Sequence, residues 1–90
     1  AAKAAIDSLT VTWAKELGPA GIRVAGIAPG YIETGSMRDA MGEDAIDLVV
    51  GETALRRTGT PSEFCRGIFA LIDNGFFHGR VLQLDGGLFL

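Results

Sequence analysis

Apolar residues near the start of the chain recur at spacings of three and four, which places their side chains on one face of a helix. The alanines around them favour the helical state. The pattern ends at Gly18-Pro19, where the glycine suits a left-handed helix cap and the proline cannot continue the helix. We therefore predict an amphipathic helix whose apolar face is formed by Ile6, Leu9, Trp13 and Leu17.

Two short apolar runs predict strands. The first, IRVAGIA at residues 22–28, is rich in branched side chains and has Arg23 as its one clearly polar residue. Such a run is typical of a strand that is buried on both faces of a parallel sheet. The second strand is expected over residues 80–84, and an Asp-Gly-Gly turn follows it.

The segment between these strands is broken into small pieces. Ser36 and Asp39 fit a capping box for a short helix over residues 37–41, and residues 43–50 carry apolar side chains at helical spacing. Because glycines divide the segment, we interpret residues 36–58 as a mobile flap rather than a core element. These glycines are Gly42, Gly51 and Gly59.

The last helix has the strongest local signals. Thr60 can cap it, Pro61 suits its first turn, and Glu63 completes a Thr-x-x-Glu capping box. Asn74-Gly75 is expected to end it. Its wide apolar surface, which indicates contacts on two sides, consists of Phe64, Cys65, Ile68, Phe69, Leu71 and Ile72.

This order of elements predicts an α/β fold with a parallel strand–helix–strand unit. Two strands are too few for a stable sheet, and the first is of the kind that needs a further neighbour. We therefore expect residues 1–90 to be one portion of a larger domain.

Composition and charge narrow the possible partners. The chain has 90 residues, 48% apolar and 21% charged, with a net charge of −3 and no basic cluster. We therefore expect neither a nucleic-acid partner nor a membrane partner. The single Cys65 and the single His78 predict no disulfide framework and no metal site, and they favour a reducing, cytoplasmic location.

A candidate ligand site follows the first predicted strand. Ligands of open α/β sheets bind beyond the carboxyl ends of the strands, and Pro29-Gly30 stands at that place. A glycine lets backbone approach a ligand closely, and the hydroxyl of Thr34 can meet a phosphate or an amide. An ordinary turn is the alternative reading of this pair.

Three separated segments carry a family resemblance. KAAIDSLTVTWAKELGPAGIRVAGIAPGYIET, RTGTPSEF and GRVLQLDGG together resemble the C-terminal part of the short-chain dehydrogenase/reductase family. The resemblance implies the C-terminal part of a Rossmann-like doubly wound parallel sheet, with the nucleotide-binding half outside these 90 residues. It also implies NAD or NADP as the cofactor and an alcohol/carbonyl pair as the substrate.

The resemblance assigns Lys3 to the lysine of the Tyr-x-x-x-Lys signature of the family. The tyrosine is then expected two positions before Ala1, off this chain. A phenol has a pKa of about 10, and a nearby ammonium lowers it toward neutrality, so Lys3 is the predicted catalytic lysine. It is also expected to bind the nicotinamide ribose. The alternative is a solvated lysine paired with Asp7 one turn later.

By the same resemblance, Pro29, Gly30, Ile32 and Thr34 bind the nicotinamide end of the cofactor. The backbone amide and carbonyl of Ile32 match the groups that hold the carboxamide, and Thr34 matches a hydroxyl that contacts the carboxamide or a phosphate. Tyr31 is expected to line the pocket or to pack rather than to act in catalysis. Ala25 departs from the family, which usually has asparagine there, and we expect a local change in packing.

The remaining singled-out residues are expected to play structural parts. Trp13 is predicted in the core or a subunit interface, His78 in a surface loop, and Cys65 as an inert buried thiol. Methionines of the flap are equally suited to substrate contact or to packing. We expect packing or solvated roles for Phe76, Phe77, Arg56 and Arg57.

Two functions of different classes remain open. The first is an NAD(P)-dependent oxidoreductase of which this chain is a C-terminal fragment, inactive alone, in a parent that is a homo-oligomer, either a dimer or a tetramer. The second is a non-catalytic α/β module for subunit association. An epimerase or dehydratase of the extended branch is disfavoured by the Ile-x-Pro-Gly and Asp-Gly-Gly segments.

Overall fold

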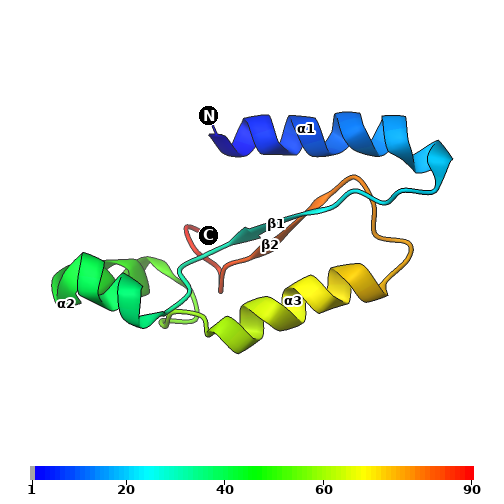
Figure 1. Ribbon diagram of the computed structural model, residues 1–90. Coiled ribbons are helices and arrows are strands. Elements are labelled where there is room, and N and C mark those ends of the chain that lie inside the picture. The colour runs from blue at the N-terminus through cyan, green and yellow to red at the C-terminus, as the bar shows by residue number, and fades with distance from the viewer. Residues whose placement is uncertain (1) are drawn as a thin grey trace.

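The computed structural model describes residues 2–90. The two strands lie between one helix on each face, and a third helix lies beyond their carboxyl ends (Figure 1). This is the layered α/β arrangement that the order of elements predicts. The elements are α1 (Ala2–Leu17), the 3-10 turn η1 (Gly18–Ala20), β1 (Gly26–Pro29), α2 (Gly35–Glu52), α3 (Pro61–Asp73) and β2 (Val81–Leu84).

Helix α1 covers one face of the sheet and ends at Leu17, directly before the predicted stop at Gly18-Pro19. Its buried residues are Thr10 and Ala14, small side chains that allow the helix to approach the strands. Gly18 begins the 3-10 turn, and the left-handed residue that closes it is Gly21, with a φ of 81°. The prediction of Gly18 as the left-handed cap was therefore wrong, because the extra turn moves the chain reversal three residues on. Trp13 is half exposed, at 50%, so it is not part of a core within this chain.

The sheet consists of β1 and β2, which pair in parallel. Gly26 lies opposite Val81, and Pro29 lies opposite Leu84. The parallel pairing confirms the expected unit, but β1 begins four residues later than predicted. The reason is that the backbone N–H of Val24 donates to Nδ1 of His78 at 3.1 Å instead of pairing with a strand.

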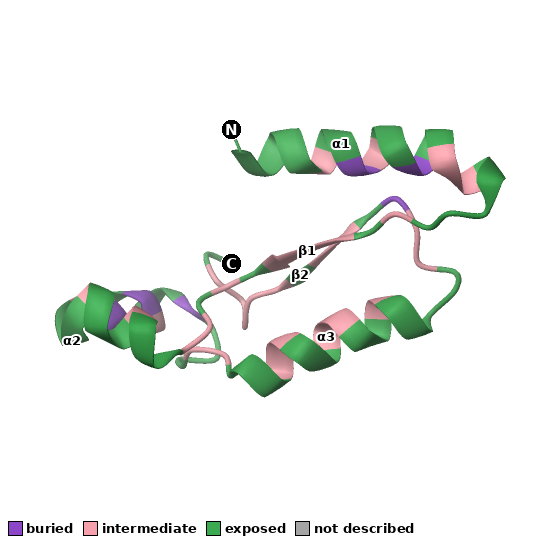
Figure 2. Ribbon diagram, in the orientation of Figure 1, coloured by how far each residue is buried: buried purple, intermediate pink, exposed green. Residues whose placement is uncertain are grey.

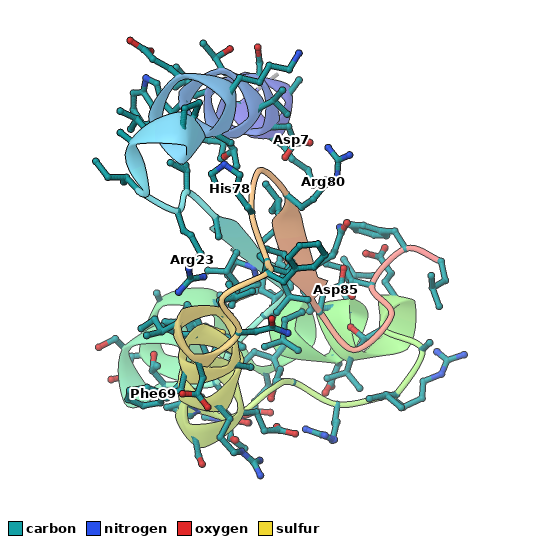
Figure 3. All side chains as sticks on the ribbon, turned by 90° about the vertical axis from the view of Figure 1, so that its right-hand side faces the viewer. Asp7, Arg23, Phe69, His78, Arg80 and Asp85 are labelled. Atoms are coloured by element: carbon teal, nitrogen blue, oxygen red, sulfur yellow. The ribbon has the colours of Figure 1, made fainter. Side chains whose placement is uncertain are left out.

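His78 links α1 to the segment that leads into the sheet. While Nδ1 accepts from Val24, Nε2 lies 2.8 Å from the carbonyl oxygen of Ala14. Because Nδ1 is an acceptor, Nε2 carries the proton and donates to Ala14. Figure 3 shows the ring between α1 and the strands. The prediction of His78 as a surface loop residue was wrong, since its ring is half-buried and bonded on both sides.

Arg23 performs a similar task on the other face. Its guanidinium donates to the carbonyl oxygens of Leu71 at 3.0 Å and Ile72 at 2.6 Å, and also to that of Asn74 at 3.0 Å. These carbonyls belong to the end of α3, where the last turn of a helix lacks backbone partners and a cation is favourable. Arg23 therefore caps α3 from a position about fifty residues earlier in the chain (Figure 3).

The start of α3 is as predicted. The Thr60 side chain accepts from the Glu63 N–H at 3.1 Å, and the Glu63 carboxylate accepts from the Thr60 N–H at 3.0 Å. Pro61 occupies the first turn. Gly67 faces the sheet closely, because a Cβ there falls 2.6 Å from the Leu84 side chain. Cys65, expected to be buried, is exposed, since it lies away from that face.

Helix α2 contains both of the expected short helices in one element with a break. Gly42 has φ 77° and ψ 166°, which interrupts the helical path; this backbone conformation is essentially restricted to glycine. The interpretation of the whole segment as a flap without core residues was wrong for the second half. Ile46 and Val49 are 4% and 8% exposed and belong to the buried residues of the described chain.

Most residues on the outer faces of α1 and α3 are exposed (Figure 2). The buried hydrophobic residues of the described chain are Ala14, Ile46 and Val49. Two strands offer too little surface to cover two helices, so side chains such as Phe69 and Ile72 are exposed. Among residues 2–90, no helix has the length and apolar character needed to cross a membrane.

Candidate functional site

The candidate site begins where the two strands end. The Gly30 N–H donates to the Leu84 carbonyl at 3.0 Å, which continues the sheet one residue past Pro29. A Cβ on Gly30 falls 2.8 Å from the Cα of Asp85, so no other residue fits here without moving the backbone. The Pro-Gly pair thus brings the next segment directly over the carboxyl edge of the sheet, where ligands of such folds bind.

Ile32 presents an unpaired backbone. It forms a parallel bridge with Gly59, and the two bonds of this bridge come from its neighbours. Gly59 N–H donates to the Tyr31 carbonyl at 2.8 Å, and Glu33 N–H donates to the Gly59 carbonyl at 2.8 Å. The N–H and C=O of Ile32 therefore point to the opposite side. Within residues 2–90 neither group has a hydrogen-bond partner, and together they offer one donor and one acceptor.

Thr34 is the N-cap of α2. Its Oγ1 accepts from the backbone N–H of Met37 at 3.1 Å, so the expected cap at Ser36 was wrong. Helix α2 begins two residues earlier because threonine in an extended conformation places its hydroxyl over the first turn. A hydroxyl has one proton as well as two lone pairs. The Thr34 proton is therefore left to donate to a ligand while the oxygen caps the helix.

Lys3 lies in the first turn of α1. Its Nζ is 3.8 Å from Oδ2 of Asp7, and its side chain is 57% exposed, so the predicted alternative ion pair is present. The start of α1 lies at the same end of the sheet as the carboxyl ends of both strands (Figure 1). Lys3 and the segment of residues 29–34 thus share one end of the fold, and an exposed ammonium at this end is free to meet a ligand.

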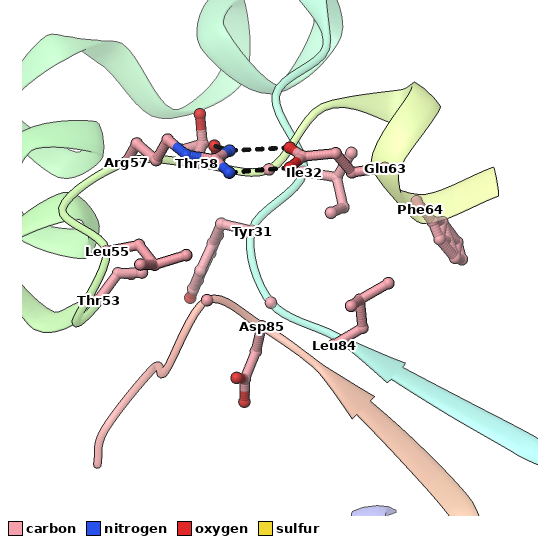
Figure 4. Close-up of a pocket in the computed structure, with 13 residues that line it drawn as sticks. Tyr31, Ile32, Thr53, Leu55, Arg57, Thr58, Glu63, Phe64, Leu84 and Asp85 are labelled. Carbon is pink, nitrogen blue, oxygen red and sulfur yellow. Dashed lines mark hydrogen bonds and ion pairs between the residues drawn. The ribbon is translucent and has the colours of Figure 1, made fainter. Parts of the chain in front are cut away.

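A pocket of about 210 Å³ opens beside this segment. Figure 4 shows Tyr31, Leu55 and Phe64 around it, with Leu84 and Asp85 at the strand end. Tyr31 thus lines a pocket as expected. Of the predicted cofactor residues, Gly30 and Ile32 line the pocket, whereas Lys3, Pro29 and Thr34 do not.

An ion pair forms one wall of the pocket. Both guanidinium nitrogens NH1 and NH2 of Arg57 donate to the Glu63 carboxylate at 2.8 Å (Figure 4). These hydrogen bonds, followed by the one from the Thr60 N–H, lower the pKa of Glu63 to about 2. The expectation that Arg57 is simply solvated was therefore incomplete, because this arginine is committed to the first turn of α3.

Sequence reasoning missed Glu33. Its carboxylate accepts from Arg38 and from the hydroxyl of Thr58 at 2.9 Å. The hydrogen bond from Arg38 is the largest cause that lowers the pKa of Glu33, followed by the bond from Thr58. The acid–base pair five residues apart crosses a helix cap, so no helical spacing reveals it. Glu33 stands between Ile32 and Thr34 and therefore influences how both are held.

Metal ligation has no candidate cluster in the described part of the chain. Within residues 2–90, no three side chains of histidine, cysteine, aspartate or glutamate gather as metal ligands do. The residues predicted to form the site offer the backbone N–H and C=O of Ile32, the Thr34 hydroxyl and the Lys3 ammonium.

Comparisons with known proteins identify related proteins. A family profile described as enoyl-(acyl carrier protein) reductase matches residues 1–89. The 3-oxoacyl-(acyl-carrier-protein) reductase of Thermotoga maritima is 39% identical in an alignment of 90 positions that covers 98% of this chain and 36% of that protein. The chain thus spans about a third of the length of such relatives.

Solved structures give the same result. A short-chain dehydrogenase/reductase of Serratia marcescens is 33% identical with a TM-score of 0.85, over 98% of this chain and 36% of that one. A structure described as ElxO with NADP bound is 34% identical with a TM-score of 0.82, over 94% of this chain and 36% of that one. Matched along nearly its whole length by a family profile and by relatives of this kind, the chain belongs to the short-chain dehydrogenase/reductase family.

Proposed function

We propose that the protein carrying this chain is an oxidoreductase that transfers a hydride between NAD(H) or NADP(H) and an alcohol/carbonyl pair. The observation that carries the proposal is the free backbone of Ile32, whose N–H and C=O have no partner within residues 2–90. A carboxamide has an NH₂ donor and a C=O acceptor, so it pairs with these two groups. This match supports nicotinamide as the ligand.

The neighbouring residues support the same ligand. The absence of a side chain at Gly30 lets the segment lie against Asp85 and brings Ile32 over the edge of the sheet. The remaining proton of the Thr34 hydroxyl donates to a carboxamide or phosphate oxygen. Such contacts orient the nicotinamide ring and so select the face that reacts. When bound, the dinucleotide supplies or accepts the hydride.

Lys3 is proposed to tune the acid that completes the reaction. Reduction of a carbonyl adds a hydride to carbon and a proton to oxygen, so an acid must stand at the oxygen. The family signature expects a tyrosine four residues before Lys3, which places both side chains on one helical face. The Lys3 ammonium stabilises the phenolate and lowers the pKa of that tyrosine, and it can donate to the ribose hydroxyls.

The substrate is proposed to enter beside residues 36–58, which border the pocket at Tyr31. The Thermotoga maritima relative is described as a 3-oxoacyl reductase, and another relative was solved with NADP. These descriptions support a carbonyl substrate and a nicotinamide dinucleotide for the present protein.

Nuclear magnetic resonance of the Ile32 amide tests the proposal. With isotope-labelled isoleucine in the complete protein that carries this chain, titration with NADPH and NADH is expected to shift the Ile32 amide resonance strongly. The amide of Ile68 on α3 serves as the control and is expected to stay in place, because its helix position leaves it hydrogen-bonded within α3. An unmoved Ile32 amide at saturating concentrations of both dinucleotides contradicts the proposal.

Subunit association is the second candidate function, and exposed apolar side chains favour it. Phe69 and Ile72 on α3 are 67% and 62% exposed, and α1 exposes Trp13. We propose that such faces are covered in a homo-oligomer, a dimer or a tetramer. Light scattering separates the two functions: an oligomer that shows no dinucleotide binding supports the association module alone.

A further inference from the structure

Arg38 contacts two carboxylates, one from a residue before it in the sequence and one from a residue after it. Its Nε and NH2 donate to Oε1 of Glu33 at 2.8 and 2.5 Å, and its NH1 donates to Oε1 of Glu43 at 2.5 Å. The fork of a guanidinium allows such divided binding, which the point charge of a lysine does not. One side chain thus joins the segment before α2 to a residue well inside that helix.

The bond to Glu43 spans the break in α2. Gly42 lies between the two partners with φ 77° and ψ 166°, and open space surrounds the position of its missing Cβ. No side chain therefore wedges the two halves of α2 at this point. Among the described residues, the ion pair of Arg38 with Glu43 is the side-chain hydrogen bond that crosses the break.

The bond to Glu33 reaches the proposed cofactor segment. The second carboxylate oxygen of Glu33 accepts from the Thr58 hydroxyl at 2.9 Å, and the backbone N–H of Glu33 donates to the Gly59 carbonyl at 2.8 Å. Glu33 is thus held on three sides, between Ile32 with its free backbone and Thr34 with its capping hydroxyl. The hydrogen bonds that Arg38 donates to Glu33 and then to Glu43 raise its pKa, so the guanidinium stays charged.

We propose that Arg38 is a positioning residue that couples the Ile32 and Thr34 contacts to the angle between the two halves of α2. The inference rests on the proposed function, because it assigns those contacts to the dinucleotide. The three side chains are 39–70% exposed. Exposed ion pairs are individually weak and are screened by salt, so we expect the coupling to weaken as the salt concentration rises.

Hydrogen exchange without dinucleotide tests the coupling. In the complete protein, Arg38→Gln is expected to speed exchange of the amides of residues 33–41 by roughly 3- to 10-fold, the scale of a small network of exposed charged hydrogen bonds. Arg66→Gln on α3 is the matched control, because it removes the same charge from an exposed arginine of another helix. Equal exchange in these two variants overturns the inference.

Substituting each carboxylate in turn tests the contacts of Arg38 with Glu33 and with Glu43 separately. Glu43→Gln is expected to speed exchange of the amides of residues 35–41 and to leave exchange of the Glu33 amide slow. Glu33→Gln is expected to speed exchange of the Glu33 amide and of residues 35–41 alike. Arg38→Lys is expected to fall between wild type and Arg38→Gln, because it keeps the charge and loses the fork. Equal effects of Glu33→Gln and Glu43→Gln on amide exchange contradict the proposed division across Gly42.

Dinucleotide affinity links the coupling to the site. Arg38→Gln is expected to raise the dissociation constant of the preferred dinucleotide by roughly 3- to 10-fold while the urea midpoint of unfolding matches that of Arg66→Gln. A protein that binds no dinucleotide but shows the exchange difference contradicts the proposed function and leaves the positioning of residues 33–41 in place. If the protein binds dinucleotide but Arg38→Gln leaves the hydrogen exchange of residues 33–41 unchanged, the positioning role of Arg38 is contradicted and the proposed function stands.

Discussion

Gly30 and Asp85 approach so closely that a Cβ on Gly30 falls 2.8 Å from both the Cα and the Cβ of Asp85. Gly30 follows β1 and Asp85 follows β2, so this contact locks the two strand ends together at the candidate site. Two of the three nearest atoms, the Cα and the carbonyl oxygen of Asp85, belong to the backbone, which cannot swing aside as the end of a long side chain can.

Gly30→Ala is expected to lower the free energy of unfolding by about 1–3 kcal/mol, because the added methyl group must displace the backbone at Asp85. Gly51→Ala is the matched control: nothing lies within 4 Å of its missing Cβ, and it stands inside α2. Alanine there is expected to stabilise by about 0.5–1 kcal/mol. Urea unfolding measures both, and a Gly30→Ala midpoint equal to that of wild type contradicts the account.

Arg23→Gln is expected to destabilise the protein by about 1–2 kcal/mol, since several carbonyls at the end of α3 lose a charged donor. The lower end applies because the guanidinium is exposed. Arg66→Gln removes the same charge from α3 and is expected to change the urea midpoint little. Hydrogen exchange should localise the Arg23→Gln effect to the last turn of α3; a uniform change would argue against its role as a cap.

The Glu63 carboxylate predicts a pH dependence. Its pKa is lowered to about 2 in the folded state, mainly by Arg57, and is about 4.3 in an unfolded chain. The folded state therefore binds this proton less well, so its contribution to stability is complete above about pH 5 and is lost as pH falls toward about 2.

Glu63→Gln keeps a side chain that can complete the capping box but removes the titration. Denaturant midpoints measured between about pH 5 and 2 are expected to fall less steeply for Glu63→Gln than for wild type. Identical slopes would show that the ion pair with Arg57 does not form in solution.

Lys3→Met is expected to lower kcat of the complete protein by about 100-fold or more, the scale of a lost acid–base contribution. Lys15→Met, in the last turn of the same helix, is the control and is expected to leave kcat unchanged. If Lys3 serves only in its ion pair with Asp7, both substitutions will have equally small effects on steady-state rates.

Local signals predicted the parts of the fold that depend on neighbours in the sequence. The capping box of Thr60 and Glu63 needed no distant contact, and its prediction is confirmed. The apolar run at residues 80–84 also predicted β2 (Val81–Leu84), which forms by pairing with β1. The order of elements also gave the parallel pairing. The break at Gly42 was visible because glycine interrupts an apolar pattern.

Distant contacts account for the errors. β1 starts late because the Val24 N–H meets His78, fifty-four positions away, and no periodicity encodes that bond. No periodicity encodes the contact of Arg23 with the end of α3 either. Ile46 and Val49 form a buried face although glycines on either side suggested a mobile segment.

In the candidate site too, some residues could be predicted from the sequence and others depend on the fold. Motif resemblance pointed to Ile32 and Thr34, and the fold adds why they suit a ligand: a bridge that leaves one backbone free, and a cap that leaves one proton free. Glu33 and Arg38 were missed, because their pairing depends on where α2 begins. The catalytic role of Lys3 stays a prediction, as does a cytoplasmic location.

Transfer of deuterium tests the central claim most directly. The complete protein that carries this chain is supplied with reduced dinucleotide, deuterated at the transferable position of the nicotinamide, and with a 3-oxoacyl thioester as the carbonyl substrate. The account predicts that deuterium appears on the new carbinol carbon of the product, as mass spectrometry will detect. An alcohol product without deuterium, from dinucleotide labelled on either face in turn, would contradict hydride transfer at this site.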